Sequence, residues 1–574
     1  MYLKNLADTS SRRFVSSFHG KRFMGTYSDI YQRREQTGCE LCQLLIRSLT
    51  DKPTITTTNN DSARCRLSWV LDGRLAPGMV KRTRRLAIEW VAIDAVYEPS
   101  YIVLVAPDGR DAGDANFFLG RRLANLGVAN FQLVERWLSL CRESHPDCRI
   151  DHTSPTFLDL QSQACFMVLD VKGMLLRELP EGAKYAALSY TWGPPDGATA
   201  LEKFTATDLN THELEKENGV AEVLGMLPLA IRNAIALTRR LGIDYIWIDS
   251  LCIMQGNEPS WGANARFMDS IYGNAELTIC AADGDGADSG LQALYALDIE
   301  HPDGYTRGAE YQAIAMYSQE TEDSVLELML SWPSDAHISV SRWNSRAWTF
   351  QERMLSKRCL ICVNKSMYLH PPGGSTALSV ELTGAAARTF STRILRRLAT
   401  NPVAVYEDCI QMYTFRQLSD ESDILSAFAG IGKVLCKALA RNAGDETALL
   451  FGLPASHLDY ALLWQPNECP ERRCLSNAYF PSWSWSGWET GMGVSYWRTA
   501  VEGPQVDLYE WRKRHTWIKY YIRDSTNHLR WIWDKDAYML PEISATMDRC
   551  RGYETIDPAT AAGQVVVEFC LWST

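Results

Sequence analysis

The sequence contains no long apolar run. No stretch reaches the roughly 18 consecutive apolar residues that a membrane-spanning helix needs. The first residues, MYLKNLADTSSRRFVSSFHG, also lack the apolar segment of a secretory signal. We therefore expect no membrane span and a cytoplasmic location. In that compartment the 16 cysteines are expected to be reduced thiols or metal ligands rather than disulfides.

Positive charge is also scarce. Lys and Arg number 58 against 69 Asp and Glu, which gives a net charge of -11. This sign disfavours binding to a phosphate backbone, so we expect no nucleic-acid partner. The sequence also lacks a G-x-x-x-x-G-K-S/T phosphate loop and a G-x-S-x-G nucleophile turn. Common nucleotide-triphosphatase and serine-hydrolase chemistries are therefore not indicated.

Apolar residues are abundant, and the chain is long enough for several cores. Hydrophobic residues make up 46% of its 574 residues and include 19 tryptophans. Composition and turn residues divide the chain into an N-terminal region (1–150), a middle region (180–370) and a C-terminal region (400–574). We expect α+β structure in the two flanking regions.

Strand and helix patterns alternate in the middle region. Residues 185–190, 243–248 and 276–282 read as buried strands. Between them, 228–241 and 261–275 have apolar residues at helical spacing, the second with a stripe that includes Trp261 and Met268. The pattern predicts an open, mainly parallel α/β sheet.

Several polar or aromatic residues follow the predicted strands. Trp192 comes after the first strand, Asp249 and Cys252 after the second, and the loop 283–290 after the third. Ligands of open α/β sheets bind beyond the carboxyl ends of the strands, so these residues are candidates for a binding site. The alternative is structural: Asp249 caps the following turn and Cys252 packs in the core.

Two acidic residues are candidates for catalysis. Asp249 and Glu352 suit a carboxylate pair in which one protonates or polarises and the other stabilises developing positive charge. Cys252 as a nucleophile would need a nearby imidazole, and none of the ten histidines lies in a recognisable protease signature.

Two separated pairs in the N-terminal region suit zinc. Cys39 and Cys42 form a Cys-x-x-Cys pair, and His145 and Cys148 form a His-x-x-Cys pair. Together they make a tetrahedral ligand set for a structural zinc ion, if the fold joins them. Cys141 falls on an apolar helical stripe and is expected to pack instead. Ordinary buried thiols remain the alternative for all of these cysteines.

The middle region resembles the fungal heterokaryon-incompatibility (HET) domain. The similar segments are YAALSYTWG (185–193), LPLAIRNAIALTRRLGIDYIWIDSLCIMQ (227–255), FMDSIYGNAELTICAADGDGADSGL (267–291) and SRAWTFQERMLSKRCL (345–360). Two later segments, YTFRQLSDESDILSAFAGI (413–431) and FPSWSWSGWETG (480–491), resemble the variable extension that often follows this domain. One departure is Met254, which stands where the family usually has an acid.

The resemblance implies a fold and a role. The fold would be similar to that of Toll/interleukin-receptor (TIR) domains, and the role would be non-self recognition and programmed cell death through a protein partner or self-association. The alternative is a TIR-like NAD(P) glycohydrolase, with NAD as the substrate or cofactor. Glu352 or Asp249 would supply the acid and Tyr190 or Trp192 would stack on the base. Cys252 and Gln255 complete the predicted ligand-binding set. Fold analogy alone does not establish chemistry.

Overall fold

The computed structural model describes most of the chain in two compact units. The described residues are 22–50, 61–72, 83–92, 100–104, 127–144, 148–150, 154–163, 166–193, 204–292, 314–318, 325–331, 334–363, 366–370, 394–439, 448–473, 475, 480–496, 521–523 and 529–531. The first unit comprises Met1–Asn257, Asn274–Asn344 and Ser356–Phe390, and the second comprises Glu258–Gly273, Ser345–Leu355 and Ser391–Thr574. The division into the ranges 1–150, 180–370 and 400–574 stays a prediction.

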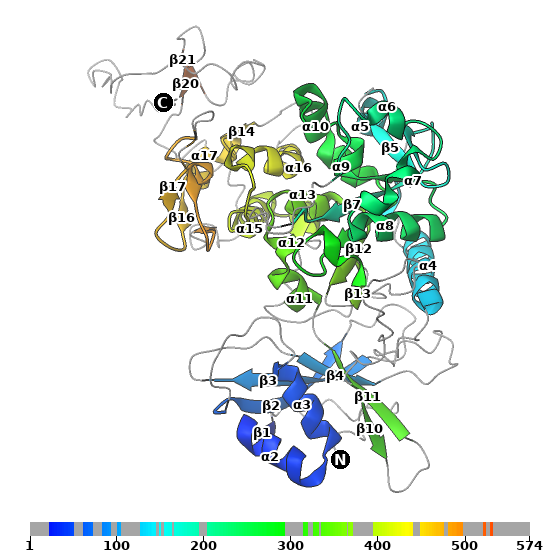
Figure 1. Ribbon diagram of the computed structural model, residues 1–574. Helices are drawn as coiled ribbons and strands as arrows, with labels where there is room; N and C mark the ends of the chain where they lie inside the picture. Colours follow the sequence, from blue (N-terminus) through cyan, green and yellow to red (C-terminus); the bar gives the residue numbers. More distant parts are fainter. Residues whose placement is uncertain are drawn as a thin grey trace, which may run out of the picture. The chain divides into compact units, whose positions relative to one another are not determined.

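The first unit contains a six-stranded antiparallel sheet in the order β1-β2-β3-β4-β11-β10 (Figure 1). Its strands are β1 (Arg22–Thr26), β2 (Arg64–Asp72), β3 (Thr83–Val91), β4 (Ser100–Leu104), β10 (Ile314–Ser318) and β11 (Val325–Ser331). The last two strands come from the predicted middle region. The pairing of β11 with β4 therefore joins segments more than two hundred residues apart in the chain.

Two helices accompany this sheet, α2 (Tyr27–Thr37) and α3 (Glu40–Thr50). In α3 the buried residues Cys42, Leu45, Ile46 and Leu49 recur at the spacing of one helical face. They join the core formed by the sheet, where the Trp90 indole N–H donates to the Ser48 hydroxyl at 2.8 Å. The N-terminal part is thus an α+β structure, as expected from the sequence.

The first unit also contains a seven-stranded sheet in the order β13-β12-β9-β7-β8-β5-β6. Its strands are β5 (Met167–Asp170), β6 (Leu175–Glu178), β7 (Tyr185–Tyr190), β8 (Tyr245–Trp247), β9 (Leu277–Ala281), β12 (Cys359–Val363) and β13 (Ser366–His370). The four strands β12, β9, β7 and β8 are parallel, whereas β13, β5 and β6 pair antiparallel. The sheet is mixed, so the expectation of a mainly parallel sheet holds only for its four central strands.

The centre of this sheet follows the sequence pattern. All six residues of β7 are buried, β8 has a neighbouring strand on each side, and Trp247 has no exposed surface. Helix α8 (Leu229–Arg240) begins after Pro228 and is followed by Gly242, whose φ of 68° is typical of a helix end. It packs against β7 and β8.

An ion network, in which Glu276 and Arg358 are buried and Arg142 is partly exposed, joins the amino ends of β9 and β12. Glu276, next to β9, accepts hydrogen bonds from Arg142 Nε at 2.8 Å and lies 3.6 Å from Arg358 Nη1. Arg358 precedes β12 and also donates to the Glu276 carbonyl and to Cys141 Sγ. Arg142 and Cys141 belong to α4 (Gly127–Ser144), so this helix is joined to the sheet. Cys141 packs there with no exposed surface, as its helical stripe predicted.

The second unit is built mainly of helices. They include α10 (Glu258–Asn274), α13 (Trp348–Leu355), α15 (Pro402–Tyr413) and α16 (Ala429–Leu439), and a two-stranded sheet pairs β16 (Trp464–Pro466) with β19 (Val494–Tyr496). Trp261, predicted on the apolar stripe of α10, is 42% exposed, whereas Met268 of the same stripe is buried. This placement corrects the predicted stripe at its amino end.

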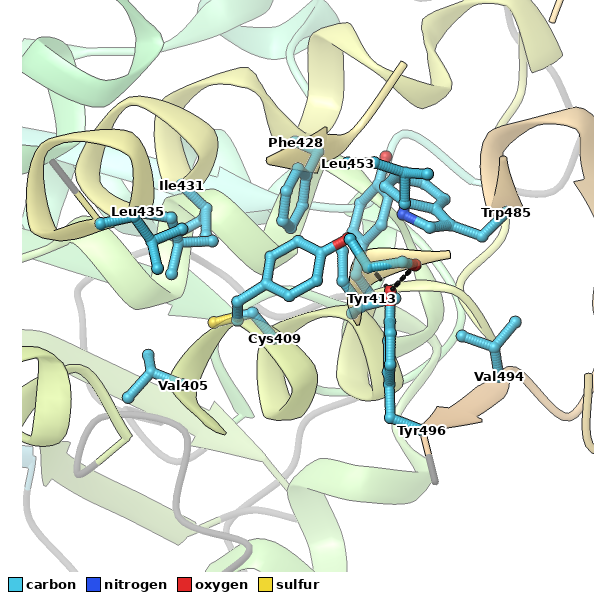
Figure 2. Close-up of a cluster of buried hydrophobic side chains, with 14 of the residues drawn as sticks. Val405, Cys409, Tyr413, Phe428, Ile431, Leu435, Leu453, Trp485, Val494 and Tyr496 are labelled. Carbon is cyan, nitrogen blue, oxygen red and sulfur yellow. Dashed lines mark hydrogen bonds between the residues drawn. The ribbon is translucent and has the colours of Figure 1, made fainter. Parts of the chain in front are cut away.

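An aromatic cluster forms the core of the second unit (Figure 2). The ring centroid of Tyr413 lies 5.0 Å from that of Phe428 and 5.8 Å from that of Trp485, and the Phe428 and Trp485 centroids are 5.7 Å apart. Tyr413 and Phe428 come from segment 413–431 and Trp485 comes from segment 480–491. The two C-terminal segments therefore share one core, since each supplies rings that the other buries.

Candidate functional site

The candidate site lies at the carboxyl ends of the central parallel strands. The chain leaves β7 for β8 on one side, and then returns past β7 to β9 on the other. Such a reversal of strand order is where open α/β sheets bind ligands. The residues that follow β7, β8 and β9 therefore define the site.

Trp192 and Asp249 meet at this edge. Trp192 follows β7 by two residues, and Asp249 opens the short helix α9 (Asp249–Cys252) directly after β8. The Trp192 indole N–H donates to Asp249 Oδ2 at 2.8 Å, while Asp249 Oδ1 accepts the backbone N–H of Ser250 at 2.7 Å. The prediction that the two residues lie at one edge of one sheet is confirmed. Both side chains are half-buried, so part of each remains accessible.

Cys252 lies in the core below this edge. It is 3% exposed, and its Sγ accepts the N–H of Ile248 at 3.3 Å. Burial raises the pKa of its thiol to about 12, and the Asp249 charge acts in the same direction. A thiolate is therefore disfavoured, which argues against a nucleophile. These contacts agree with the structural alternative, in which Cys252 packs in the core.

Gln255 closes the turn after α9. Its Nε2 donates to the carbonyls of Ile253 (3.1 Å) and Asp249 (3.3 Å), and its backbone N–H donates to Ala206. Its amide N–H groups thus support the backbone that carries Asp249. A direct contact of Gln255 with a ligand stays a prediction.

Tyr190 ends β7 as a buried side chain, only 5% exposed. Next to it in the strand, the Ser189 hydroxyl accepts the indole N–H of Trp343 at 2.7 Å. Trp343 belongs to α12 (Arg342–Ser345). This contact could not be predicted from a local pattern, because the two residues are 154 positions apart in the chain. Of the two aromatic candidates for stacking, Trp192 is the more exposed.

The loop after β9 is tied back to α8. Asp283 Oδ2 accepts the N–H of Gln292 at 3.0 Å, and Asn233 of α8 accepts the N–H of Leu291 at 2.9 Å. Gly290 has a φ of 69°, and a Cβ there would meet Asn233 Oδ1 at 2.7 Å. These contacts fix the loop and place a second acid, Asp283, at this edge. Its position directly after a buried strand is the same signal that singled out Asp249.

Glu352 lies in the second unit, so its pairing with Asp249 stays a prediction. Helix α13 begins at Trp348, and Glu352 is 7% exposed. Its charge acts on Arg416, whose pKa is lowered to about 9 by burial and by Arg353 and raised in part by Tyr413 and Glu352. Its burial shows that the carboxylate is not a surface charge.

The surroundings of Arg416 suggest a structural role for the acid at position 352. Its guanidinium donates to the carbonyls of Met412 (2.9 Å) and Arg346 (3.1 Å) and lies 4.9 Å from the centre of the Phe350 ring. A buried cation of this kind needs a nearby negative charge. Glu352 is one of the groups whose charge partly offsets the effect of burial on Arg416, which is a structural reason for the carboxylate.

Trp348 also contacts an acid in the second unit. Its indole N–H donates to Asp423 Oδ2 at 3.3 Å. Burial raises the pKa of the Asp423 carboxyl to about 6, although the hydrogen bond from Trp348 acts in the opposite direction. The sequence analysis did not single out this aspartate.

The predicted zinc ligands are only partly described. Cys39 and Cys42 lie at the start of α3, and Cys148 is a buried residue. His145 lies outside the described residues. Within the described part of the chain, no three His, Cys, Asp or Glu side chains are grouped so as to hold a metal ion. The four-ligand site stays a prediction.

Comparison with known families identifies the sheet region. Residues 185–352 match the family described as Heterokaryon incompatibility protein (HET). The chain contains a HET domain. The match spans β7 to Glu352 and includes both Trp192 and Asp249. Comparison with curated proteins and with solved structures gave no match, so the TIR-like fold of the HET domain stays a prediction.

The HET domain carries no helix of membrane-spanning character, and the same holds for every other helix within the described ranges.

Proposed function

We propose that the protein acts in fungal non-self recognition and triggers programmed cell death through its HET domain. The observation that carries this proposal is the family match over residues 185–352, together with the meeting of two matched segments in the Trp192–Asp249 hydrogen bond. The domain works in the cytoplasm, by self-association or by binding a protein partner.

Induced expression of the full chain in a fungal host tests this role. The expected result is growth arrest followed by loss of viability. Expression at the same level of a chain carrying Trp247→Ala, which removes a fully buried core side chain, is expected to be harmless because the sheet is destabilised. Normal growth with abundant, folded wild-type protein would contradict the proposal.

A second candidate function is hydrolysis of NAD at the same edge. A carboxylate beside a half-exposed indole favours it, because the ring suits stacking and the acid suits a developing positive charge. In this reaction the bond between ribose and nicotinamide breaks, nicotinamide leaves, and water adds to the ribose carbon. Asp249 would stabilise the cationic ribose and accept the proton of water.

Asp249 is a better test residue than Glu352 for this chemistry. Glu352 is buried and its charge acts on Arg416, so after Glu352→Gln a loss of activity would also follow from a weakened fold. The experiment is incubation of purified protein with NAD and chromatography of the products. Release of nicotinamide by the wild type and its loss in a folded Asp249→Asn variant are expected. No release by the wild type would exclude the hydrolase.

A further inference from the structure

Cys39 and Cys42 lie one helical turn apart at the start of α3. Gly38 ends α2 with a φ of 62°, and the chain reverses there. The Cys39 carbonyl accepts the N–H of Gln43 at 3.1 Å, so Cys39 is the residue that caps α3. Its Sγ takes the place of the usual Ser or Thr oxygen and accepts the N–H of Cys42 at 3.4 Å. The cap therefore holds the first sulfur beside the residue that carries the second.

The two thiols differ in accessibility. Cys39 is partly exposed, whereas Cys42 is 3% exposed, and their side chains are hydrogen-bonded to each other. Positions three apart in an α-helix have Cα atoms about 5 Å apart. A disulfide requires roughly 4.4 to 6.8 Å between Cα atoms. Cys39 directly precedes the helix, and its Sγ lies 3.4 Å from the Cys42 nitrogen, so the two residues are close enough for a disulfide to form.

A second Cys-x-x-Cys in the chain provides a comparison. Cys359 and Cys362 have the same spacing, but they lie in strand β12 and neither is exposed. At about 3.3 Å per residue, positions three apart in a strand are roughly 10 Å apart and point to opposite faces. A disulfide cannot join them. The helix, rather than the motif, distinguishes Cys39 and Cys42.

We propose that Cys39 and Cys42 form a redox-active dithiol that exchanges with a small external disulfide such as glutathione disulfide. The Cys39 thiolate attacks one sulfur of that disulfide, whose S–S bond breaks and releases one glutathione thiolate. Burial raises the pKa of the Cys42 thiol to about 11, so Cys42 acts only as the second thiol, already held beside Cys39. It attacks Cys39 Sγ and displaces the second glutathione, and its proton passes to the departing glutathione thiolate. The protein loses two electrons and two protons, and the external disulfide becomes two thiols.

The experiment uses the reduced full-length protein in glutathione buffers of increasing oxidised fraction. Free thiols are blocked, and the cysteine peptides are measured by mass spectrometry. The expected product is a Cys39–Cys42 peptide lighter by two hydrogen atoms, reversible by reductant. In the Cys42→Ser variant, glutathione is expected to remain bound to Cys39, because no second thiol can displace it. In the Cys39→Ser variant, Cys42 is expected to stay unmodified, because Cys39 is the partly exposed thiol and Cys42 is buried.

Cys359 and Cys362 serve as the internal control and are expected to remain reduced. The proposal is overturned if Cys39 and Cys42 both stay reduced in fully oxidised glutathione, or if wild-type Cys39 keeps a stable glutathione adduct. Stoichiometric bound zinc that protects both thiols would also overturn it and would support the predicted metal site instead.

Discussion

The indole N–H of Trp192 and the carboxylate of Asp249, 57 residues apart in the chain, are joined by a hydrogen bond of 2.8 Å. This bond links the ends of β7 and β8, which pair in parallel from Tyr185 with Tyr245 to Ala187 with Trp247. A hydrogen bond to a charged acceptor is worth about 1.5 to 3 kcal/mol, and partial exposure of this pair favours the lower end.

A double-mutant cycle measures this link. Trp192→Phe keeps the aromatic ring but removes the donor, and Asp249→Asn keeps the shape but removes the charge. We expect each change to lower the free energy of unfolding by about 1 kcal/mol, and the double variant to lose less than the sum because the two share one interaction. Urea denaturation gives the values. Additive losses would show that the two side chains are not coupled.

The core position of Trp247 predicts a large cavity effect. Trp247 has no exposed surface, and Trp247→Ala is expected to cost roughly 3 to 5 kcal/mol. Trp261, which is 42% exposed, is the matched control, and Trp261→Ala is expected to cost about 1 kcal/mol. Equal losses for the two variants in thermal or urea unfolding would contradict the central placement of β8.

The Glu276 network predicts that a buried ion pair affects the free energy of unfolding more than an exposed one does. Side-chain exposure is 5% for Glu276 and 3% for Arg358, so Glu276→Ala leaves a buried cation unpaired and is expected to cost roughly 3 to 5 kcal/mol. Lys172 and Asp244 form an exposed pair at 2.6 Å, and Lys172→Ala is expected to leave the urea midpoint of unfolding almost unchanged. The comparison fails if both variants unfold at the same urea concentration.

Asp423 predicts a pH dependence of stability. Its pKa of about 6 in the folded protein is above the value of about 3.9 for an unfolded aspartate, so the folded state binds the proton more tightly. This contribution to stability is complete below about pH 4 and is lost as the pH rises through about 6. Partial exposure reduces its size to about 1 kcal/mol.

Asp423→Asn isolates this effect. The difference in unfolding free energy between wild type and variant is expected to change with pH in the stated window, with the wild type losing stability relative to the variant as the pH rises. Asp420 is the control, because hydrogen bonds from Ser422 lower its pKa and give the opposite sign. A pH-independent difference for Asp423→Asn would mean that its carboxyl titrates as in the unfolded chain.

Local apolar pattern was enough to predict the centre of the HET sheet. Short apolar runs predict β7 and β8, and apolar residues at helical spacing, with Pro228 before them and Gly242 after them, predict α8. The edge position of Trp192 and Asp249 followed from parallel topology. These features depend on residues close together in sequence or on a general rule of sheet architecture.

Features that depend on distant contacts could not be predicted. β11 pairs with β4 and brings β10 into the N-terminal sheet, and β5 pairs antiparallel with β8 and brings β6 to the sheet edge, although nothing in the local sequence specifies these partners. The effect of the Glu352 charge on Arg416 likewise joins residues 64 positions apart, so it could not be predicted from a local pattern, and the catalytic role of Glu352 stays a prediction.

The viability of cells that express Asp249→Asn tests the central claim most directly. Wild-type protein is expected to kill a fungal host, and folded Asp249→Asn at equal abundance is expected to reduce killing at least about tenfold, because the edge loses its charged acceptor while the sheet is retained. Asp244→Asn, a change in the exposed pair with Lys172, is expected to kill like the wild type. Full killing by folded Asp249→Asn would contradict the account.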